Sequence, residues 1–86
     1  MTVTIDLITP GQHGFTILGA TNEALQDVHI YFQTSDLGHQ SANLRATSNQ
    51  NGQWIAAIPG DFPVGTKITA FARYGRAKLA SLSQVL

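Results

Sequence analysis

Apolar and polar residues alternate along most of this chain, and this period of two is the feature that most constrains its fold. Successive side chains of an extended strand point to opposite faces, so the alternation indicates strands that are buried on one side only. The clearest alternating segments are residues 2–7, 28–33, 53–58 and 67–73. Weaker strands are expected over residues 15–21, 42–48 and 78–85, which makes seven strands of five to eight residues.

The same alternation assigns side chains to the interior. Trp54, Phe32, Ile30 and Ile68 are expected in the core, because each occupies an inward position of a clearly alternating strand. The other positions expected to face inward in these four strands are Val3, Ile5, Leu7, Val28, Ala56, Ile58, Ala70 and Ala72.

Turn residues separate the strands. Asn51-Gly52 lies between two alternating runs and is typical of a hairpin, while residues 59–65 are too rich in Pro and Gly to be anything but a loop. Seven short strands leave no room for crossover helices, so we expect an antiparallel β-sandwich or a small barrel, with the sandwich favoured. No repeat or linker interrupts the chain, which indicates one domain over residues 1–86.

Composition excludes several classes of protein. The chain has five basic and five acidic residues and no cysteine. Without cysteine it can form neither a disulfide scaffold nor a thiolate-bound metal site. A net charge of zero argues against nucleic acid and anionic membranes, which favour a basic excess, and no run approaches the roughly 18 apolar residues of a membrane span. We therefore expect no nucleic-acid partner and no membrane insertion.

Motifs for metal binding and catalysis are also missing from the sequence. His13, His29 and His39 are too widely spaced for the close ligand pair that is usual in a zinc site, and the aspartates are scattered rather than dense as calcium requires. No nucleophile elbow and no phosphate-binding glycine loop is present. We expect no metal, no cofactor and no enzymatic activity.

Three segments of the chain carry a family resemblance. They are Ile17-Leu18-Gly19-Ala20-Thr21 with Leu25-Gln26-Asp27-Val28-His29-Ile30, then Asn51-Gly52-Gln53-Trp54 with Ile58-Pro59, then Gly65-Thr66-Lys67-Ile68-Thr69-Ala70-Phe71-Ala72. These resemble the bacterial immunoglobulin-like (Big) domain family, except that Lys67 stands where the family usually has an aromatic residue. The resemblance implies a seven-stranded antiparallel Ig-like β-sandwich. Such domains occur in adhesins, as spacers or sugar-binding accessories of secreted enzymes, and on bacteriophage capsids and tails.

Outward-facing residues suggest where this domain makes contacts. In an Ig-like arrangement the third and sixth strands are neighbours, so Tyr31 and Phe71 would share an outer face with His29 and Arg73. Apolar patches of this kind tend to mark interaction surfaces, and Tyr and Phe are enriched at interface cores. We therefore predict that Tyr31, Phe71, His29 and Arg73 bind a partner. On the opposite sheet, Leu18 and Ile55 would also point outward.

The leading functional hypothesis is a non-catalytic binding or structural domain of a bacteriophage virion, acting in capsid decoration or tail assembly through protein–protein contacts. The N-terminal segment lacks a secretion signal, which suggests synthesis in the host cytoplasm before incorporation into the virion. The alternative is one domain of a larger bacterial surface adhesin or secreted enzyme, serving as a spacer or a carbohydrate-binding accessory. A carbohydrate partner would need an aromatic platform, for which Tyr31, Phe71 and Tyr74 are the candidates.

Overall fold

Seven strands follow one another along the chain in the computed structural model, which describes residues 1–35 and 41–86. No helix lies in the described part of the chain. The prediction of seven strands is confirmed, and Asp36 and His39 lie outside the described residues. The strands are β1 (Val3–Gly11), β2 (Gly14–Thr21), β3 (Asp27–Thr34), β4 (Ser41–Thr47), β5 (Gln53–Pro59), β6 (Lys67–Arg73) and β7 (Ala80–Val85).

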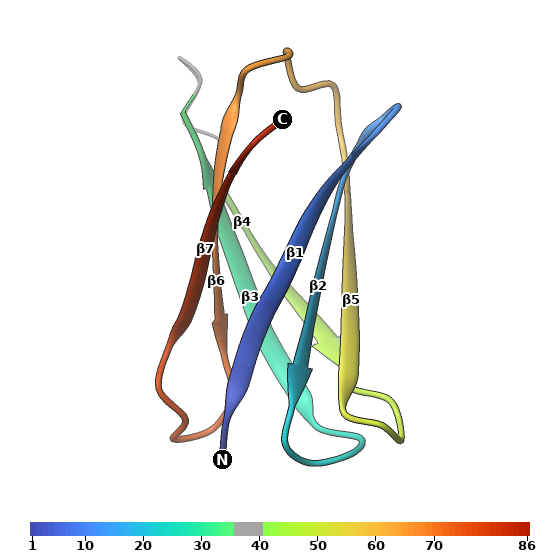
Figure 1. Ribbon diagram of the computed structural model, residues 1–86, viewed down its shortest axis with the longest axis vertical. Helices are drawn as coiled ribbons and strands as arrows, with labels where there is room; N and C mark the ends of the chain where they lie inside the picture. The colour runs from blue at the N-terminus through green and yellow to red at the C-terminus, as the bar shows by residue number, and fades with distance from the viewer. Residues whose placement is uncertain (36–40) are drawn as a thin grey trace.

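The strands form two antiparallel sheets that pack face to face (Figure 1). One sheet has the order β1-β2-β5 and the other the order β4-β3-β6-β7. Consecutive strands therefore change sheet between β2 and β3, between β4 and β5, and between β5 and β6. This is the two-layer arrangement of an Ig-like β-sandwich, with the fourth strand paired to the third, and the predicted fold is confirmed.

The core fills the space between the two sheets. Trp54, Phe32, Ile30 and Ile68 all lie there, each no more than 3% exposed. Inside the four-stranded sheet, bulky residues on β3 face alanines on β6, since Phe32 pairs with Ala70 and Ile30 with Ala72. This pairing of large with small side chains leaves room for the aromatic residues of the other sheet, and the Phe15 ring meets that of Phe32 edge-on at 5.2 Å.

The prediction for β1 is wrong beyond Ile5. Leu7 was expected inside but is 48% exposed, whereas Ile8 is 2% exposed. The register with β2 shifts between Ile5 and Leu7, which leaves Asp6 as an extra residue in a β-bulge. The bulge reverses the alternation, so that Asp6 stays exposed to water and Ile8 enters the core.

Gly19 allows the largest core side chain to lie directly on the sheet. It pairs with Trp54 across β2 and β5. A Cβ atom at Gly19 would lie 2.2 Å from the Thr4 carbonyl oxygen and 2.2 Å from Cζ2 of the Trp54 indole. Only glycine, which has no Cβ atom, lets the Thr4 carbonyl and the Trp54 indole both lie this close to the backbone.

We expect Gly19→Ala to lower the free energy of unfolding by about 1–3 kcal/mol or more, as overpacking of a core does. Urea denaturation followed by circular dichroism measures this loss. Gly11→Ala is the matched control, because its nearest contact would be an ordinary 3.6 Å. Equal stability of the two variants would contradict the close packing of Trp54 on β2.

Leu25, in the loop between β2 and β3, has an unfavourable backbone conformation. Its φ is 59°, in the left-handed region that glycine prefers, and its side chain is 64% exposed. The residue therefore carries backbone strain that its side-chain contacts do little to offset.

We expect Leu25→Gly to raise the free energy of unfolding by about 0.5–1 kcal/mol, since the left-handed conformation costs a leucine more than glycine loses in entropy. Thermal unfolding measured by calorimetry tests this. Ala24→Gly should lower the stability instead, because Ala24 has no positive φ to relieve. A melting temperature that falls for both variants would refute the strain at Leu25.

Candidate binding face

The outer surface of the four-stranded sheet brings the predicted contact residues together. Tyr31 pairs with Phe71 and His29 pairs with Arg73, because β3 and β6 are neighbours in the sheet. Their side chains point outward, because they alternate along the two strands with the buried residues Ile30 and Ala72. We call Tyr31, Phe71, His29 and Arg73 the aromatic face.

Two rings occupy the centre of the aromatic face. The centroids of Tyr31 and Phe71 lie 5.1 Å apart with an angle of 19° between the ring planes. Carbon atoms in contact lie about 3.5–4.0 Å apart, so a 5.1 Å centroid separation means that the rings are stacked with an offset. The His29 ring packs at 6.0 Å and 61° to Tyr31. The three rings thus form one connected apolar surface, and each of them is half-buried.

Polar side chains surround these rings on both neighbouring strands. Asn43 on β4 lies directly opposite Tyr31, and Ser81 on β7 lies directly opposite Phe71. One row further along, the hydroxyls of Thr69 and Ser83 are 3.0 Å apart. A ligand resting on the rings would therefore meet amide and hydroxyl groups on either side, which can both donate and accept hydrogen bonds.

The aromatic face carries positive charge. Arg45 on β4 forms an ion pair with Asp27 on β3, and both side chains are exposed. Arg73 on β6 has no acidic partner among the described residues, so its five N–H donors face water. Arg45 and Arg73 thus lie on either side of His29, and of the two only Arg73 lacks an acidic partner among the described residues.

Tyr74 does not contribute to the aromatic face, contrary to its candidacy as part of an aromatic platform. It is 4% exposed and its hydroxyl donates a hydrogen bond to Oε1 of Glu23 at 3.2 Å. The reason is that side chains alternate between the two faces of β6. Ala70 and Ala72 point inward, and two residues after Ala72 the side chain of Tyr74 points inward as well. Extending the period by two residues would have found this.

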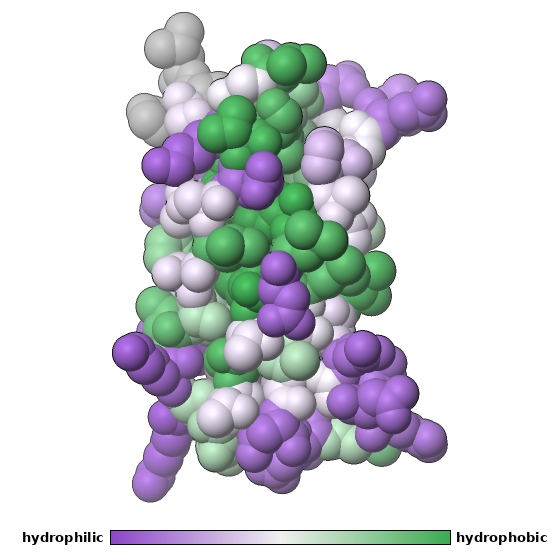
Figure 2. All heavy atoms as spheres, in the orientation of Figure 1, coloured by the Kyte–Doolittle hydropathy of each residue, from purple (hydrophilic) through white to green (hydrophobic). Residues whose placement is uncertain are grey.

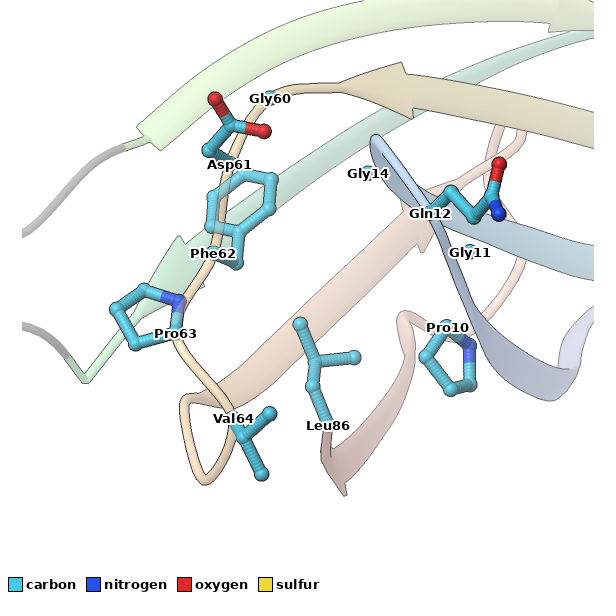
Figure 3. Close-up of a pocket in the computed structure, with 10 residues that line it drawn as sticks. All are labelled: Pro10, Gly11, Gln12, Gly14, Gly60, Asp61, Phe62, Pro63, Val64 and Leu86. Carbon is cyan, nitrogen blue, oxygen red and sulfur yellow. The ribbon is translucent and has the colours of Figure 1, made fainter.

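A pocket of about 360 Å³ lies at one end of the sandwich (Figure 3). The end of β1 contributes Pro10 on one side, the loop after β5 contributes Phe62 on the other, and Leu86 lies between them. Asp61 is its only charged side chain, and Nδ1 of His13 lies 3.8 Å from Oδ1 of Asp61, with both side chains almost fully exposed. The pocket therefore lacks the convergent titratable groups that general acid–base catalysis needs.

The outer surface of the three-stranded sheet is apolar at its centre. Leu7, Leu18 and Ile55 lie in one row across β1, β2 and β5. In the view of Figure 2, hydrophobic side chains run from the upper end along the middle of the molecule, and hydrophilic ones gather at its lower end and at the upper right. The sequence placed Leu18 and Ile55 outward, but the bulge that adds Leu7 to the row could not be read from a single strand.

Among residues 1–35 and 41–86, no three His, Cys, Asp or Glu side chains are close enough to hold a metal ion. His13 lies in the β1–β2 turn and His29 on β3, on different parts of the surface. Within the same described ranges, no helix is long and apolar enough to span a membrane.

One solved structure with this architecture is described as the crystal structure of a Br derivative of BhCBM56, a carbohydrate-binding module. It matches with a TM-score of 0.66 and 15% sequence identity, over 92% of this chain and 87% of the other. At that identity the match shows a shared fold. No protein-family model and no curated protein matches the sequence.

Tyr74 predicts a pH dependence of stability. Burial and, next, the hydrogen bond to the Glu23 carboxylate raise the pKa of Tyr74 above its usual value. An unfolded tyrosine ionises near pH 10, so the unfolded state loses this proton first as the pH rises. The stabilising effect is therefore complete below the unfolded pKa and is lost as the pH rises through the raised pKa.

We expect the free energy of unfolding of the wild type to fall above about pH 10 more steeply than that of Tyr74→Phe. Urea titrations at a series of alkaline pH values measure both slopes. Parallel slopes for the two proteins would contradict the role assigned to the Tyr74 hydroxyl.

Proposed function

We propose that this domain binds carbohydrate, without catalysis, through the aromatic face of the four-stranded sheet. The observation that carries the proposal is the offset stack of Tyr31 on Phe71 in the middle of a polar surface. One face of a pyranose ring presents only C–H groups, and such a face packs well on an aromatic ring. The neighbouring hydroxyls of the sugar then need hydrogen-bonding partners beside the rings.

The surroundings of the rings meet that need. Asn43 and Ser81 lie at the two sides of the ring pair, and Arg73 lies one row away. Planar polar groups such as an amide and a guanidinium suit the paired hydroxyls of a sugar, because two donors or acceptors are presented side by side. Arg73 also favours a sugar that bears a carboxylate or sulfate group.

The shape of the face favours a long glycan over a free monosaccharide. Together with its polar neighbours Asn43 and Ser81, it extends over four adjacent strands rather than forming a closed cavity, so a ligand would bury only one side. A single sugar loses much of its translational freedom for few contacts, whereas a polymer contacts several strands at once. The likeness in fold to a carbohydrate-binding module supports the same proposal.

Contact with a virion protein would use the same four residues, since Tyr, Phe and Arg are also enriched at protein interfaces. This hypothesis, like membership of the Big family and a location on a virion or a cell surface, stays a prediction. Binding of a glycan to the isolated domain distinguishes the two functions, because a face specialised for one protein partner has no reason to retain a polysaccharide.

We expect the domain to be retained by at least one polysaccharide in native affinity electrophoresis or in pull-down with insoluble glycans. Replacing both Tyr31 and Phe71 by alanine should weaken this binding at least about 10-fold, which corresponds to a loss of about 1.4 kcal/mol. A panel of neutral, carboxylated and sulfated polysaccharides reports the contribution of Arg73, which Arg73→Gln should remove.

Val64→Ser is the matched control, because Val64 is 97% exposed on a loop and its loss removes apolar surface away from the aromatic face. Circular dichroism confirms that each variant is folded. Failure of every glycan to bind, or undiminished binding by the folded double variant, would exclude the proposal.

A further inference from the structure

The outer edge of β5 carries backbone groups that nothing in the described chain pairs. β5 is the last strand of its sheet, so only β2 lies beside it. The Thr21 N–H donates to the Gly52 carbonyl at 2.6 Å, and the Gly60 N–H donates to the His13 carbonyl at 3.0 Å. In an antiparallel ladder every second residue bonds to the same neighbour, so Trp54, Ala56 and Ile58 also bond to β2.

The remaining residues of β5 direct their backbone groups away from β2. Those of Gln53 are already satisfied, because its N–H donates to Asn49 Oδ1 at 3.0 Å and its carbonyl accepts from the Asn49 N–H at 2.7 Å. Pro59 has no N–H to offer. A complete pair of free donor and acceptor therefore remains at two positions only, Ile55 and Ala57.

Two of the other three edge strands, β1 and β4, have features in their own sequence or register that discourage pairing. β1 has its bulge at Asp6 together with Pro10. It also contacts β7, the fourth edge strand, across the sandwich, and this contact is more extensive than the one between β5 and β4. β4 carries the charged Arg45 next to its central residue, Leu44. Bulges, prolines and charges are the usual protection of sheet edges, whereas the sequence of β5 is uncharged throughout.

We propose that β5 pairs with β5 of a second copy of this chain, antiparallel about a two-fold axis at Ala56. In this register Ile55 of each copy lies opposite Ala57 of the other. The free N–H and carbonyl groups of these two residues then form four backbone hydrogen bonds between the copies. If the axis passed through Ile55 instead, Ala57 would lie opposite the other copy's Gln53, whose backbone groups are already hydrogen-bonded. If the axis passed through Ala57, Ile55 would lie opposite the other copy's Pro59, which has no backbone N–H to donate.

The surface chemistry suits a second copy. Because β5 has no charge, two copies bring no like charges together, and the outward Ile55 gains an apolar neighbour in the partner's strand. One strand edge buries less than the roughly 1,600 Å² of a standard interface, so we expect a dimer that dissociates in the micromolar to millimolar range. This proposal is independent of the carbohydrate function.

Sedimentation equilibrium from about 10 µM to about 2 mM tests the proposal without any glycan. We expect the mass to rise toward that of a dimer, and Ala57→Lys and Ala57→Pro to weaken the association at least about 10-fold by charge repulsion and by loss of a donor. Ser83→Lys, on the outward face of β7, should associate like the wild type. A monomer at every concentration would overturn the proposal.

Amide hydrogen exchange by NMR identifies the contact. The amides of Ile55 and Ala57 should exchange more slowly at high than at low concentration, and this difference should disappear in Ala57→Lys, which keeps its backbone N–H. A dimer in which these two amides exchange at the same rate at all concentrations would show that another surface is used.

Discussion

Packing of the two inner sheet faces against each other is the contact on which the rest of this structure depends. The chain has no cysteine, and both the ion pair of Arg45 with Asp27 and the contact of His13 with Asp61 are exposed, where even an ion pair contributes only about 0–1 kcal/mol. The aromatic face is a direct product of this packing. Because Phe32 faces Ala70 and Ile30 faces Ala72 inside, Tyr31 must face Phe71 outside. The outer pair can therefore be changed without disturbing the core.

The period of two was enough to predict the seven strands and most of their inward residues, because each is a local property of one strand. It failed at Leu7, since a bulge is set by the register between two strands and Asp6 gives no local sign of it. The neighbourhood of Tyr31 and Phe71 required the order of strands in the sheet, which the Ig-like resemblance supplied. The free groups of β5 depend on its edge position and on the side chain of Asn49, and neither could be read from one segment.

The two proposed surfaces lie on different sheets, and their geometry relates them. A two-fold axis between antiparallel strands of one sheet is perpendicular to that sheet, so both copies keep the same side outward. The four-stranded sheets of the two copies would then lie on one side of the shared sheet, with both aromatic faces pointing the same way. A polymer could contact both at once, and the second contact would benefit from a high effective concentration.

The position of Trp54 separates two optical signals in this molecule. It is the only tryptophan in the chain, is 2% exposed, and lies in the interior rather than on the aromatic face. Its fluorescence should therefore report the integrity of the interior and remain nearly constant when a ligand rests on Tyr31 and Phe71. Occupancy of the outer surface would instead alter tyrosine absorbance, so that folding and recognition can be followed independently in one unlabelled sample.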